Sequence, residues 1–366
     1  MNIPYRRVSE YQPVDVSKLR PGSSYKSLIE KRTHPIDDLV ARFGRIPEEL
    51  LTRRACPTCG STDETLELEK DHMRIVRCRR CDLVFVNPTF DETHYKQVYA
   101  SQAYQDIVRD LGINSHEYRV DRFGTERVRM MGEHLATTND TNQTTTKGTK
   151  DAKENKSVLR ALRELRGCTV RAPRYLDVGC STGFVVEAAR DKGWEAIGID
   201  LNPSAIEFGR SRGLDLRTVA LEDAGFAPGS FDAVSLFDVL EHLLDPRRTL
   251  RACAELLAPG GILFLYVPNF DSASRLLMGA NAHFIWPTHH LNYYTPATIR
   301  DLTLRHSLTP ELIVTEGLDI EDYIWYRREV LHRDADGLAE ISDVIQFLAN
   351  AGCYGKNLRV IARRAA

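Results

Sequence analysis

Hydrophobic and polar positions follow a repeating pattern from residue 174 onward. The short apolar runs that predict strands lie at 175–178, 195–199, 216–220, 231–237, 262–267, 311–315 and 358–362. The amphipathic segments that predict helices lie at 184–192, 203–212 and 239–257, and a helical insertion precedes the last strand. Strands that alternate with helices of this length indicate an α/β fold with a doubly wound, mostly parallel sheet of seven strands.

The N-terminal part of the chain lacks this alternation and predicts separate regions. Residues 1–50 form an arm with a short amphipathic helix at 36–43, and residues 51–95 form a small module that contains cysteine pairs. We expect the larger domain to span 96–366 and to begin with a helix at 115–135. Residues 137–156 are almost wholly Thr, Asn, Gln, Lys and Asp, which predicts a mobile polar insertion in this domain.

Four of the eight cysteines form two C-x-x-C pairs whose spacing indicates a metal site. Eighteen residues separate the pair Cys56 and Cys59 from the pair Cys78 and Cys81, as in a tetrahedral zinc site on a small ribbon. Redox dithiols or an iron site are the alternatives, although a redox pair usually comes singly. Because four thiolates fill the coordination sphere, we expect a structural Zn²⁺. The scattered cysteines, which we expect to be small buried residues, are Cys168, Cys180, Cys253 and Cys353.

Charge and hydropathy limit the classes of protein to consider. The net charge is −2 and 42% of the residues are hydrophobic, as in ordinary globular proteins. No stretch approaches the roughly 20 apolar residues that a membrane helix needs. The first residues also lack the apolar region of a secretory signal. We therefore expect a cytoplasmic protein that does not bind membranes.

The turn after the first predicted strand has the composition of a cofactor-binding turn. It runs Asp177-Val-Gly-Cys-Ser-Thr-Gly183, and its glycines would let a ligand approach the backbone. Gly179 and Gly183 are four positions apart, which does not match the G-x-G-x-x-G of a pyrophosphate-binding turn. Asp200 ends the second strand, where an acid can accept hydrogen bonds from ribose hydroxyls. A nicotinamide-binding Rossmann protein is the alternative interpretation.

Four segments in order resemble the motif set of class I S-adenosylmethionine-dependent methyltransferases, over about residues 174–269. They are DVGCSTG, GIDLNP, FDAVSLFDVLEHLLDP and LLAPGGILFLYVPN. The resemblance implies that S-adenosylmethionine is the cofactor and that the turn, Cys180 included, surrounds its methionine portion. It also implies that Asp200 holds the ribose hydroxyls and that Leu201 packs on the adenine. The remaining positions it implies are Glu222 and Asp223 at the adenine edge and Phe237 and Asp238 at the methionine end.

Two details of these motifs qualify the resemblance. Ser181 stands where the family commonly has glycine, and a small residue should still fit there. The pair Glu241-His242 falls inside the predicted helix at 239–257 and by itself indicates a pair on a helix surface.

A segment dense in aromatic residues and histidine follows the fifth strand. Ligands of open α/β sheets lie outside the carboxyl ends of the strands, so this segment should face the transferable methyl group. Methyl transfer to a hydroxyl or an acidic C–H requires removal of a proton, and histidine suits that role. The catalytic candidates are therefore His290, His289 and Tyr294, with His290 as the candidate general base. Alternatively, these side chains only pack beneath a lid.

The whole chain is similar to bacterial methyltransferases of sugars and secondary metabolites. The similarity rests on the ribbon ending in LVFVNP, the class I core and the late segment HLNYYT. It implies a small-molecule acceptor, namely a sugar, a nucleotide-sugar or a natural-product scaffold, and O- or C-methylation. His290 matches the histidine of the family, whereas His289 stands where some relatives have glutamate. That replacement makes O-methylation as reasonable as C-methylation.

Two other functions remain open. An RNA methyltransferase would use the ribbon to bind nucleic acid, and phosphate contacts come from arginines such as those around the ribbon. These arginines are Arg53, Arg54, Arg74, Arg77, Arg79 and Arg80. The near-neutral net charge does not favour a nucleic-acid partner. The third function is a catalytically inactive binding protein on the same fold, and a homodimer is left open as well.

Overall fold

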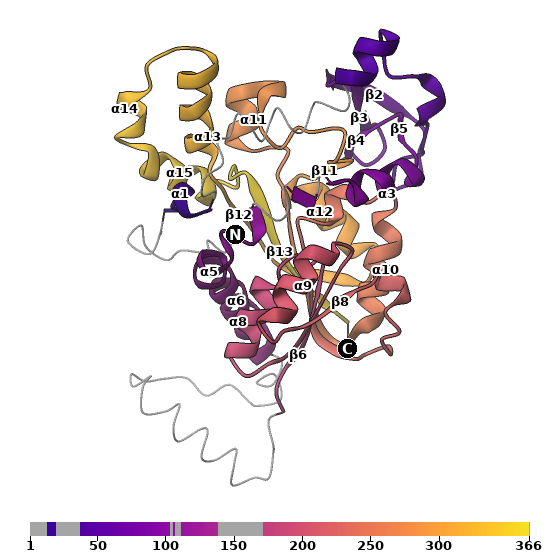
Figure 1. The fold of residues 1–366 in the computed structure, drawn as a ribbon, viewed down its shortest axis with the longest axis vertical. Helices are drawn as coiled ribbons and strands as arrows, with labels where there is room; N and C mark the ends of the chain where they lie inside the picture. Colours follow the sequence, from indigo (N-terminus) through magenta and orange to yellow (C-terminus); the bar gives the residue numbers. More distant parts are fainter. Residues whose placement is uncertain (1–12, 20–36, 103–104, 107–110, 138–170, 366) are drawn as a thin grey trace.

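A seven-stranded sheet forms the centre of the molecule (Figure 1). The computed structural model describes residues 13–19, 37–102, 105–106, 111–137 and 171–365, so most of the polar insertion and Cys168 lie outside the described residues. The strand order is β12-β13-β10-β9-β6-β7-β8. The strands from β10 to β8 are parallel, and β13 runs antiparallel to both of its neighbours. The doubly wound, mostly parallel sheet expected from the sequence is confirmed.

The elements of this sheet lie close to their predicted positions. The strands are β6 (Arg174–Val178), β7 (Glu195–Asp200), β8 (Asp215–Thr218), β9 (Phe231–Phe237), β10 (Leu257–Pro268), β12 (Leu308–Glu316) and β13 (Asn357–Arg364). Helices α6 (Thr125–Thr137), α8 (Phe184–Asp191) and α9 (Pro203–Ser211) pack on one face of the sheet. Helices α10 (Pro246–Leu256) and α12 (Pro296–Leu304) pack on the other.

The segment before α10 differs from the sequence prediction of a helix at 239–257. Residues 240–242 form a single turn of 3-10 helix, η5 (Leu240–His242), and α10 begins only at Pro246. Asp245 caps α10, because its carboxylate accepts two backbone N–H groups of the first turn. The apolar residues before Asp245 therefore belong to a buried loop, and Glu241 is 1% exposed instead of lying on a helix surface.

The helix expected at 115–135 is confirmed as a nearly continuous unit. It consists of α5 (His116–Arg119), a turn of π-helix η3 (Val120–Gly124) and α6. Helical structure is also confirmed over residues 37–43 of the N-terminal arm. None of the helices in the described part of the chain is long and apolar enough to cross a membrane.

The cysteine module forms a small sheet that includes a strand of the larger domain. Its strand order is β11-β4-β3-β2, with β2 (Glu64–Lys70), β3 (Met73–Cys78) and β4 (Val84–Val86) from the ribbon. The fourth strand, β11 (Asn292–Tyr293), comes from the segment that follows β10. Near this sheet lie η2 (Glu48–Leu50), β1 (Leu51–Thr52), β5 (Thr89–Phe90) and α3 (Glu92–Ala100). The ribbon and the histidine-containing segment thus share one sheet.

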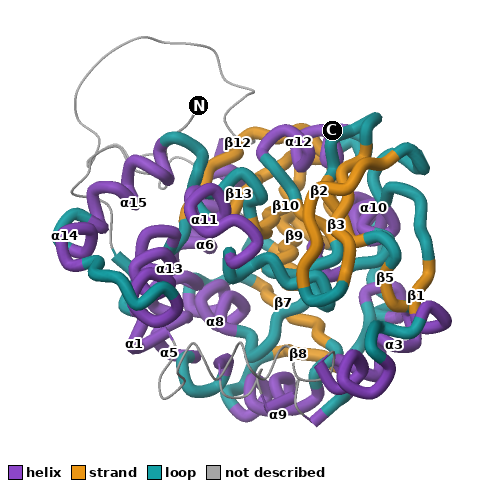
Figure 2. The backbone as a smooth tube through the Cα atoms, turned by 90° about the horizontal axis from the view of Figure 1, so that it is seen from above, coloured by secondary structure: helices purple, strands orange, loops and turns teal. Residues whose placement is uncertain are grey.

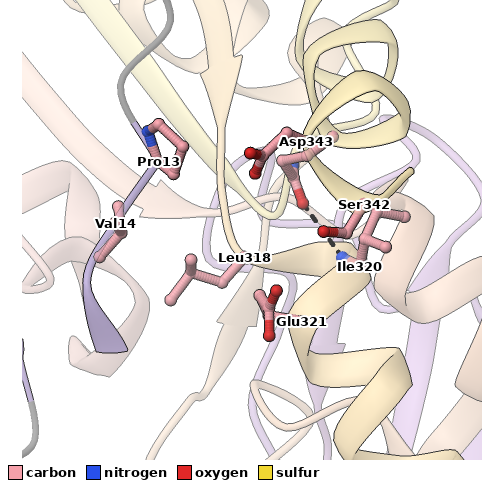
Figure 3. Close-up of a pocket in the computed structure, with 8 residues that line it drawn as sticks. Pro13, Val14, Leu318, Ile320, Glu321, Ser342 and Asp343 are labelled. Carbon is pink, nitrogen blue, oxygen red and sulfur yellow. Dashed lines mark hydrogen bonds between the residues drawn. The ribbon is translucent and has the colours of Figure 1, made fainter. Parts of the chain in front are cut away.

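A helical region lies on the side of the molecule away from the ribbon, as both overall views show (Figures 1 and 2). It contains α13 (Asp319–Trp325), η7 (Tyr326–Val330), α14 (Asp336–Ala339) and α15 (Ser342–Ala351), which form the predicted insertion between β12 and β13. Beside it lie α1 (Val16–Leu19), α11 (Ala273–Met278) and η6 (Gly279–Asn281). Pro13 and Val14 line a cavity against this region (Figure 3), and its volume of about 30 Å³ is too small for an organic substrate.

Candidate active site

The glycine-containing turn joins β6 to α8 at the carboxyl edge of the sheet. Gly179 and Gly183 have φ angles of +77° and +79°, which favour glycine. A Cβ atom on Gly179 would lie 2.3 Å from Cγ2 of Val239, so this glycine lets the loop after β9 pack against the turn. Ser181 has a φ of +49°, in the same left-handed region, which explains why glycine is common at this position in the family.

Asp200, at the end of β7, is held in a fixed orientation by the backbone. One carboxylate oxygen accepts the N–H of Ser181 and the other accepts the N–H of Asn202, each at 2.8 Å. Since a carboxylate oxygen can accept more than one hydrogen bond, both oxygens can also bind the hydroxyls of a ribose. Leu201 beside it is 64% exposed, which suits an apolar surface under an adenine ring. The geometry therefore fits the adenosine part of S-adenosylmethionine.

The other residues predicted at the cofactor take different positions. Asp177 is buried and accepts a hydrogen bond from the hydroxyl of Ser235, and burial raises the pKa of Asp177 to about 7. Cys180 packs its thiol toward Gly198 inside the core, so only its backbone lines the turn. Asp238 is exposed at the end of β9 and has a left-handed φ of +56°.

The rest of this set lies at the two ends of the predicted cofactor position. Phe237 is buried, and the guanidinium of Arg127 lies 4.2 Å from its ring centre. Arg127 places a positive charge at the methionine end, and the sequence prediction missed it because nothing in the spacing of α6 distinguishes it from a surface arginine. Glu222 and Asp223 are exposed on η4 (Leu221–Asp223), and Glu222 pairs with Arg248 at 3.3 Å.

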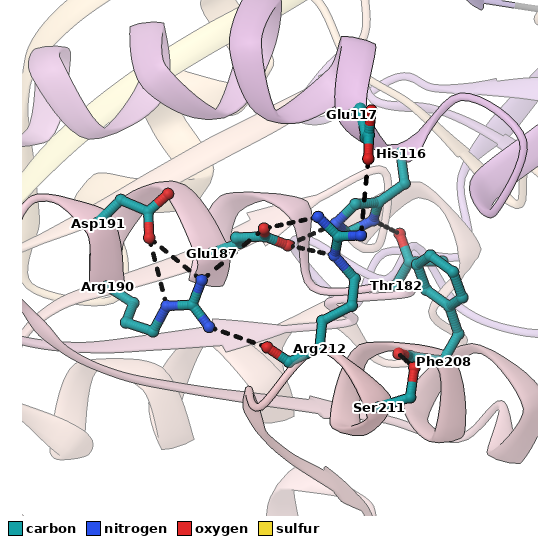
Figure 4. A network of polar contacts seen from close by, with 9 residues as sticks. All are labelled: His116, Glu117, Thr182, Glu187, Arg190, Asp191, Phe208, Ser211 and Arg212. Atoms are coloured by element: carbon teal, nitrogen blue, oxygen red, sulfur yellow. Dashed lines mark hydrogen bonds and ion pairs between the residues drawn. The ribbon is translucent and has the colours of Figure 1, made fainter.

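A buried polar network connects the turn to α5 (Figure 4). The two ring nitrogens of His116 lie 2.9 Å from Oγ1 of Thr182 and 2.8 Å from Oε2 of Glu187. Arg212 donates two hydrogen bonds of 2.8 Å to the Glu187 carboxylate. These bonds, those from Arg212 first, lower the pKa of Glu187 to about 2, while burial lowers the pKa of His116. The network fixes Thr182, and with it the turn, against two helices.

Three side chains with proton-accepting or metal-ligating atoms meet where β9 ends. The ligand atoms of Glu241, His242 and His290 all lie within 4.8 Å of one another, and Nε2 of His242 is 3.9 Å from Oε1 of Glu241. Nδ1 of His242 lies 3.0 Å from the backbone carbonyl of His289, and Nδ1 of His290 lies 2.7 Å from that of Phe284. Each ring therefore has Nε2 available in the neutral tautomer whose Nδ1–H donates to a carbonyl. We name these three residues the acceptor cluster.

Glu241 is the member of the acceptor cluster with the most unusual environment. Neither of its carboxylate oxygens has a hydrogen-bond partner among the described residues. Burial, followed by the nearby charge of Asp238, raises the pKa of Glu241 well above its usual range. A carboxyl group that meets two imidazoles in this way can exchange a proton with a bound molecule or hold a cation.

The other two catalytic candidates occupy packing positions. His289 is 9% exposed and stacks on Trp286, with ring centres 3.7 Å apart. Tyr294 is fully buried in the main hydrophobic cluster, and its hydroxyl donates to the carbonyl of Leu240 at 3.5 Å. Of the three histidine-segment candidates, His290 alone belongs to the acceptor cluster. Glu241 and His242 were missed, although Asp245 and Pro246 are the sequence signal that places them before the helix.

The four ribbon cysteines converge as their spacing predicts. Their sulfur atoms all lie within 4.8 Å of one another, and the pairs Cys56–Cys81 and Cys59–Cys78 are 3.5 Å apart. A tetrahedral zinc ion with Zn–S bonds of about 2.3 Å would separate its sulfurs by roughly 3.8 Å. Both the donor set and the distances therefore fit a zinc ion. Cys180 and Cys253 are buried as expected, whereas Cys353 is partly exposed.

A sheet of this order, a glycine-containing turn after its first strand and an acid ending the next strand define a class I S-adenosylmethionine-dependent methyltransferase domain. Residues 150–309 match the family model described as a methyltransferase domain. The chain therefore carries a class I methyltransferase domain that fits S-adenosylmethionine.

Curated relatives and solved structures share this domain. A ubiquinone biosynthesis O-methyltransferase of Xanthomonas campestris is 42% identical over 119 residues, which cover 31% of this chain and 50% of that protein. Its counterpart of Chromobacterium violaceum is 35% identical over 127 residues, covering 33% and 55%. The chain thus spans about half the length of these relatives. A solved SAM-dependent methyltransferase of Archaeoglobus fulgidus is 21% identical, with a TM-score of 0.39, covering 57% of this chain and 94% of that one.

Proposed function

We propose that this protein transfers the methyl group of S-adenosylmethionine to an oxygen atom of a small molecule, in the class of sugars, nucleotide-sugars and natural-product scaffolds. The observation that carries the proposal is the acceptor cluster, which lies at the carboxyl end of β9 directly after the predicted methionine site. The cofactor supplies an activated methyl group when bound. The protein must orient the acceptor and remove its hydroxyl proton.

His290 is the residue that we propose to take this proton. Its Nδ1 lies at the carbonyl of Phe284, which orients the ring and leaves Nε2 toward Glu241 and His242. Glu241 and His242 lie beside this nitrogen and can share or pass on the proton that it accepts. Oxygen is favoured as the methylated atom because the curated relatives are named as O-methyltransferases. The small-molecule class is supported by the ribbon and the late HLNYYT segment, as in sugar and secondary-metabolite methyltransferases.

We also propose that the four ribbon cysteines bind one structural Zn²⁺. Four thiolates leave no open coordination position for a substrate, so the ion would stabilise the ribbon and take no part in methyl transfer. The sulfur distances and the small size of the ribbon support this role.

The contacts of the ribbon arginines weaken the alternative of RNA methylation. Arg77 pairs with Glu67 at 2.9 Å, Arg79 with Asp63 at 3.7 Å and Arg53 with Glu64 at 3.8 Å. Arg54 donates to backbone carbonyls instead of facing solvent. A titration of RNA binding against salt tests this alternative, and tight binding with a steep salt dependence would revive it.

Methyl transfer from isotopically labelled S-adenosylmethionine to a panel of acceptors tests the proposed function. The panel contains nucleotide-linked sugars, free sugars and hydroxylated aromatic compounds, and mass spectrometry identifies the product. We expect an O-methylated product, and His290→Asn should lower kcat about 10²-fold with unchanged cofactor affinity. His289→Asn is the matched control with a smaller effect. Equal turnover of the His290 variant and the wild type would remove His290 from the reaction.

A further inference from the structure

Arg54 lies two residues before the first zinc ligand, yet its side chain reaches the loops of the acceptor cluster. Its Nε donates to the carbonyl of Val86 in β4 at 3.2 Å. Nη1 donates to the carbonyl of Leu244 at 3.2 Å, and Nη2 to that of Leu291 at 2.7 Å. The guanidinium thus joins three segments that are distant in sequence: the ribbon, the loop after η5 and the segment that contains His290.

The segments that Arg54 joins are those that carry the acceptor cluster. Leu291 directly follows His290, and its N–H donates to the carbonyl of Glu241 at 2.7 Å. Nη2 of Arg54 also donates to Oδ1 of Asn292 at 3.2 Å, and the amide of Asn292 donates to the carbonyl of Leu243 at 2.7 Å. Loss of the guanidinium would therefore remove hydrogen bonds on both sides of the cluster at once.

The chemistry of this position requires a guanidinium. The acceptors of Arg54 are neutral oxygens of backbone carbonyls and one amide, in several directions. A planar fork with five N–H donors can serve them together, whereas a lysine ammonium is a compact group with three donors. Burial lowers the pKa of Arg54 to about 10, so the group keeps its charge at neutral pH. A charge without a carboxylate partner in these contacts would be costly if it served only to stabilise the fold.

We propose that Arg54 is a positioning residue of the acceptor site, which joins the zinc ribbon to the two loops that carry Glu241, His242 and His290. The role rests on the proposed function of the cluster. In this arrangement the ribbon acts as a wall that sets the distance between His242 and His290. Misplacement of such groups by about 1 Å can cost about 10²-fold in rate.

Arg54→Ala, Arg54→Lys and Arg53→Ala, all in the zinc-loaded full chain, test this role with the acceptor that turns over fastest in the panel. Arg53 is the matched control, since it neighbours Arg54 in sequence but its side chain is 71% exposed. We expect Arg54→Ala to lower kcat about 10²-fold, with wild-type zinc content and cofactor affinity. Millimolar guanidinium should restore part of the rate to Arg54→Ala, whereas methylammonium should not. Arg53→Ala should match the wild type.

Two results would overturn the proposal. One is wild-type kcat in Arg54→Ala. The other is a loss of zinc and cofactor binding together with activity, without guanidinium rescue, which would make Arg54 a residue of the global fold. Amide hydrogen exchange separates this test from the proposed function, because it needs no acceptor. Exchange in 239–245 and 286–294 should be faster in Arg54→Lys than in Arg53→Ala even if no acceptor is methylated, and equal exchange would contradict the positioning role.

Discussion

At the scale of single residues, Glu241 has the environment of a group retained for function. Its carboxyl group is 1% exposed, and neither oxygen has a hydrogen-bond partner among the described residues. A buried acid without such partners costs stability, and proteins commonly keep such costs at functional sites. Nε2 of His242 lies 3.9 Å away, a distance that a bound acceptor or a proton-driven rearrangement would shorten.

Replacement of Glu241 by glutamine should therefore separate stability from activity. Glu241→Gln keeps the shape, removes the ionisable group and adds an N–H₂ donor near the imidazoles. We expect the free energy of unfolding to rise by about 1 kcal/mol and kcat to fall about 10²-fold, with unchanged cofactor affinity. Denaturant unfolding and steady-state kinetics measure the two effects. A variant that is less stable but fully active would show that Glu241 is only a structural residue.

The sequence predicted the residues of the cofactor turn better than those of the acceptor cluster. Asp200 and the glycines of the turn stand in short consecutive motifs, and their roles follow from local backbone geometry. The acceptor cluster joins Glu241 and His242 to His290 across a long stretch of chain, so only tertiary packing brings them together. Six ribbon arginines look alike in sequence, and nothing local indicates that Arg54 is the one turned inward.

At the scale of elements, α5, α8 and the segment after α9 hold the cofactor turn through charged and polar groups. The Glu187 carboxylate receives two hydrogen bonds from Arg212 and meets His116 on the same side. The pKa of Glu187 falls to about 2 in the folded protein, below its ordinary value of 4.5. A depressed carboxyl pKa stabilises the fold above pH 4.5, and this contribution disappears as the pH falls from about 4.5 toward 2.

Glu187→Gln should remove this pH-dependent contribution. At pH 7 we expect a loss of about 1–2 kcal/mol of unfolding free energy, since solvent screens part of the interaction. The difference from wild type should shrink as the pH drops below about 4.5. Glu117→Gln is the control, because Glu117 is 85% exposed at its side chain and only 3.8 Å from the same Arg212. A constant difference across pH would contradict the assignment of the stabilisation to the ionised Glu187.

The elements themselves show which sequence signals are reliable. The parallel strands are apolar runs bounded by turns, and each appears within a few residues of its predicted position. The helix predicted at 239–257 was wrong at its start because apolar periodicity continues across the loop, while the capping residues Asp245 and Pro246 set the true boundary. The two-residue strand β11 has no periodicity of its own and exists only by pairing with β4.

At the scale of the whole molecule, the ribbon and the sheet share one hydrophobic core. Cys56, Cys78 and Phe85 of the ribbon belong to the same buried cluster as Leu265 of β10 and Ile299 of α12. The shared strand β11 adds backbone hydrogen bonds between the two parts. A core that is continuous across the expected boundary at residue 95 predicts cooperative unfolding of ribbon and sheet.

Calorimetry should therefore show one unfolding transition for the zinc-loaded chain. Removal of zinc by a chelator, or the substitution Cys81→Ser, should lower the Tm of this transition. A loss of about 4 kcal/mol would lower Tm by roughly 10 °C in a protein of this size. Cys353→Ser is the control, because Cys353 lies outside the ribbon. Two separate transitions, of which only one responds to zinc, would contradict the shared core.

The central claim is that the turn after β6 and the acid at the end of β7 bind S-adenosylmethionine, and calorimetric titration of the cofactor tests it most directly. The wild type should bind one cofactor per chain, and Asp200→Ala should weaken binding about 10²-fold, because two charge-assisted hydrogen bonds are lost. Asp215→Ala, which alters an exposed acid of β8, should bind like the wild type. No binding by the wild type at high micromolar cofactor, or equal affinity of Asp200→Ala and wild type, would contradict the account.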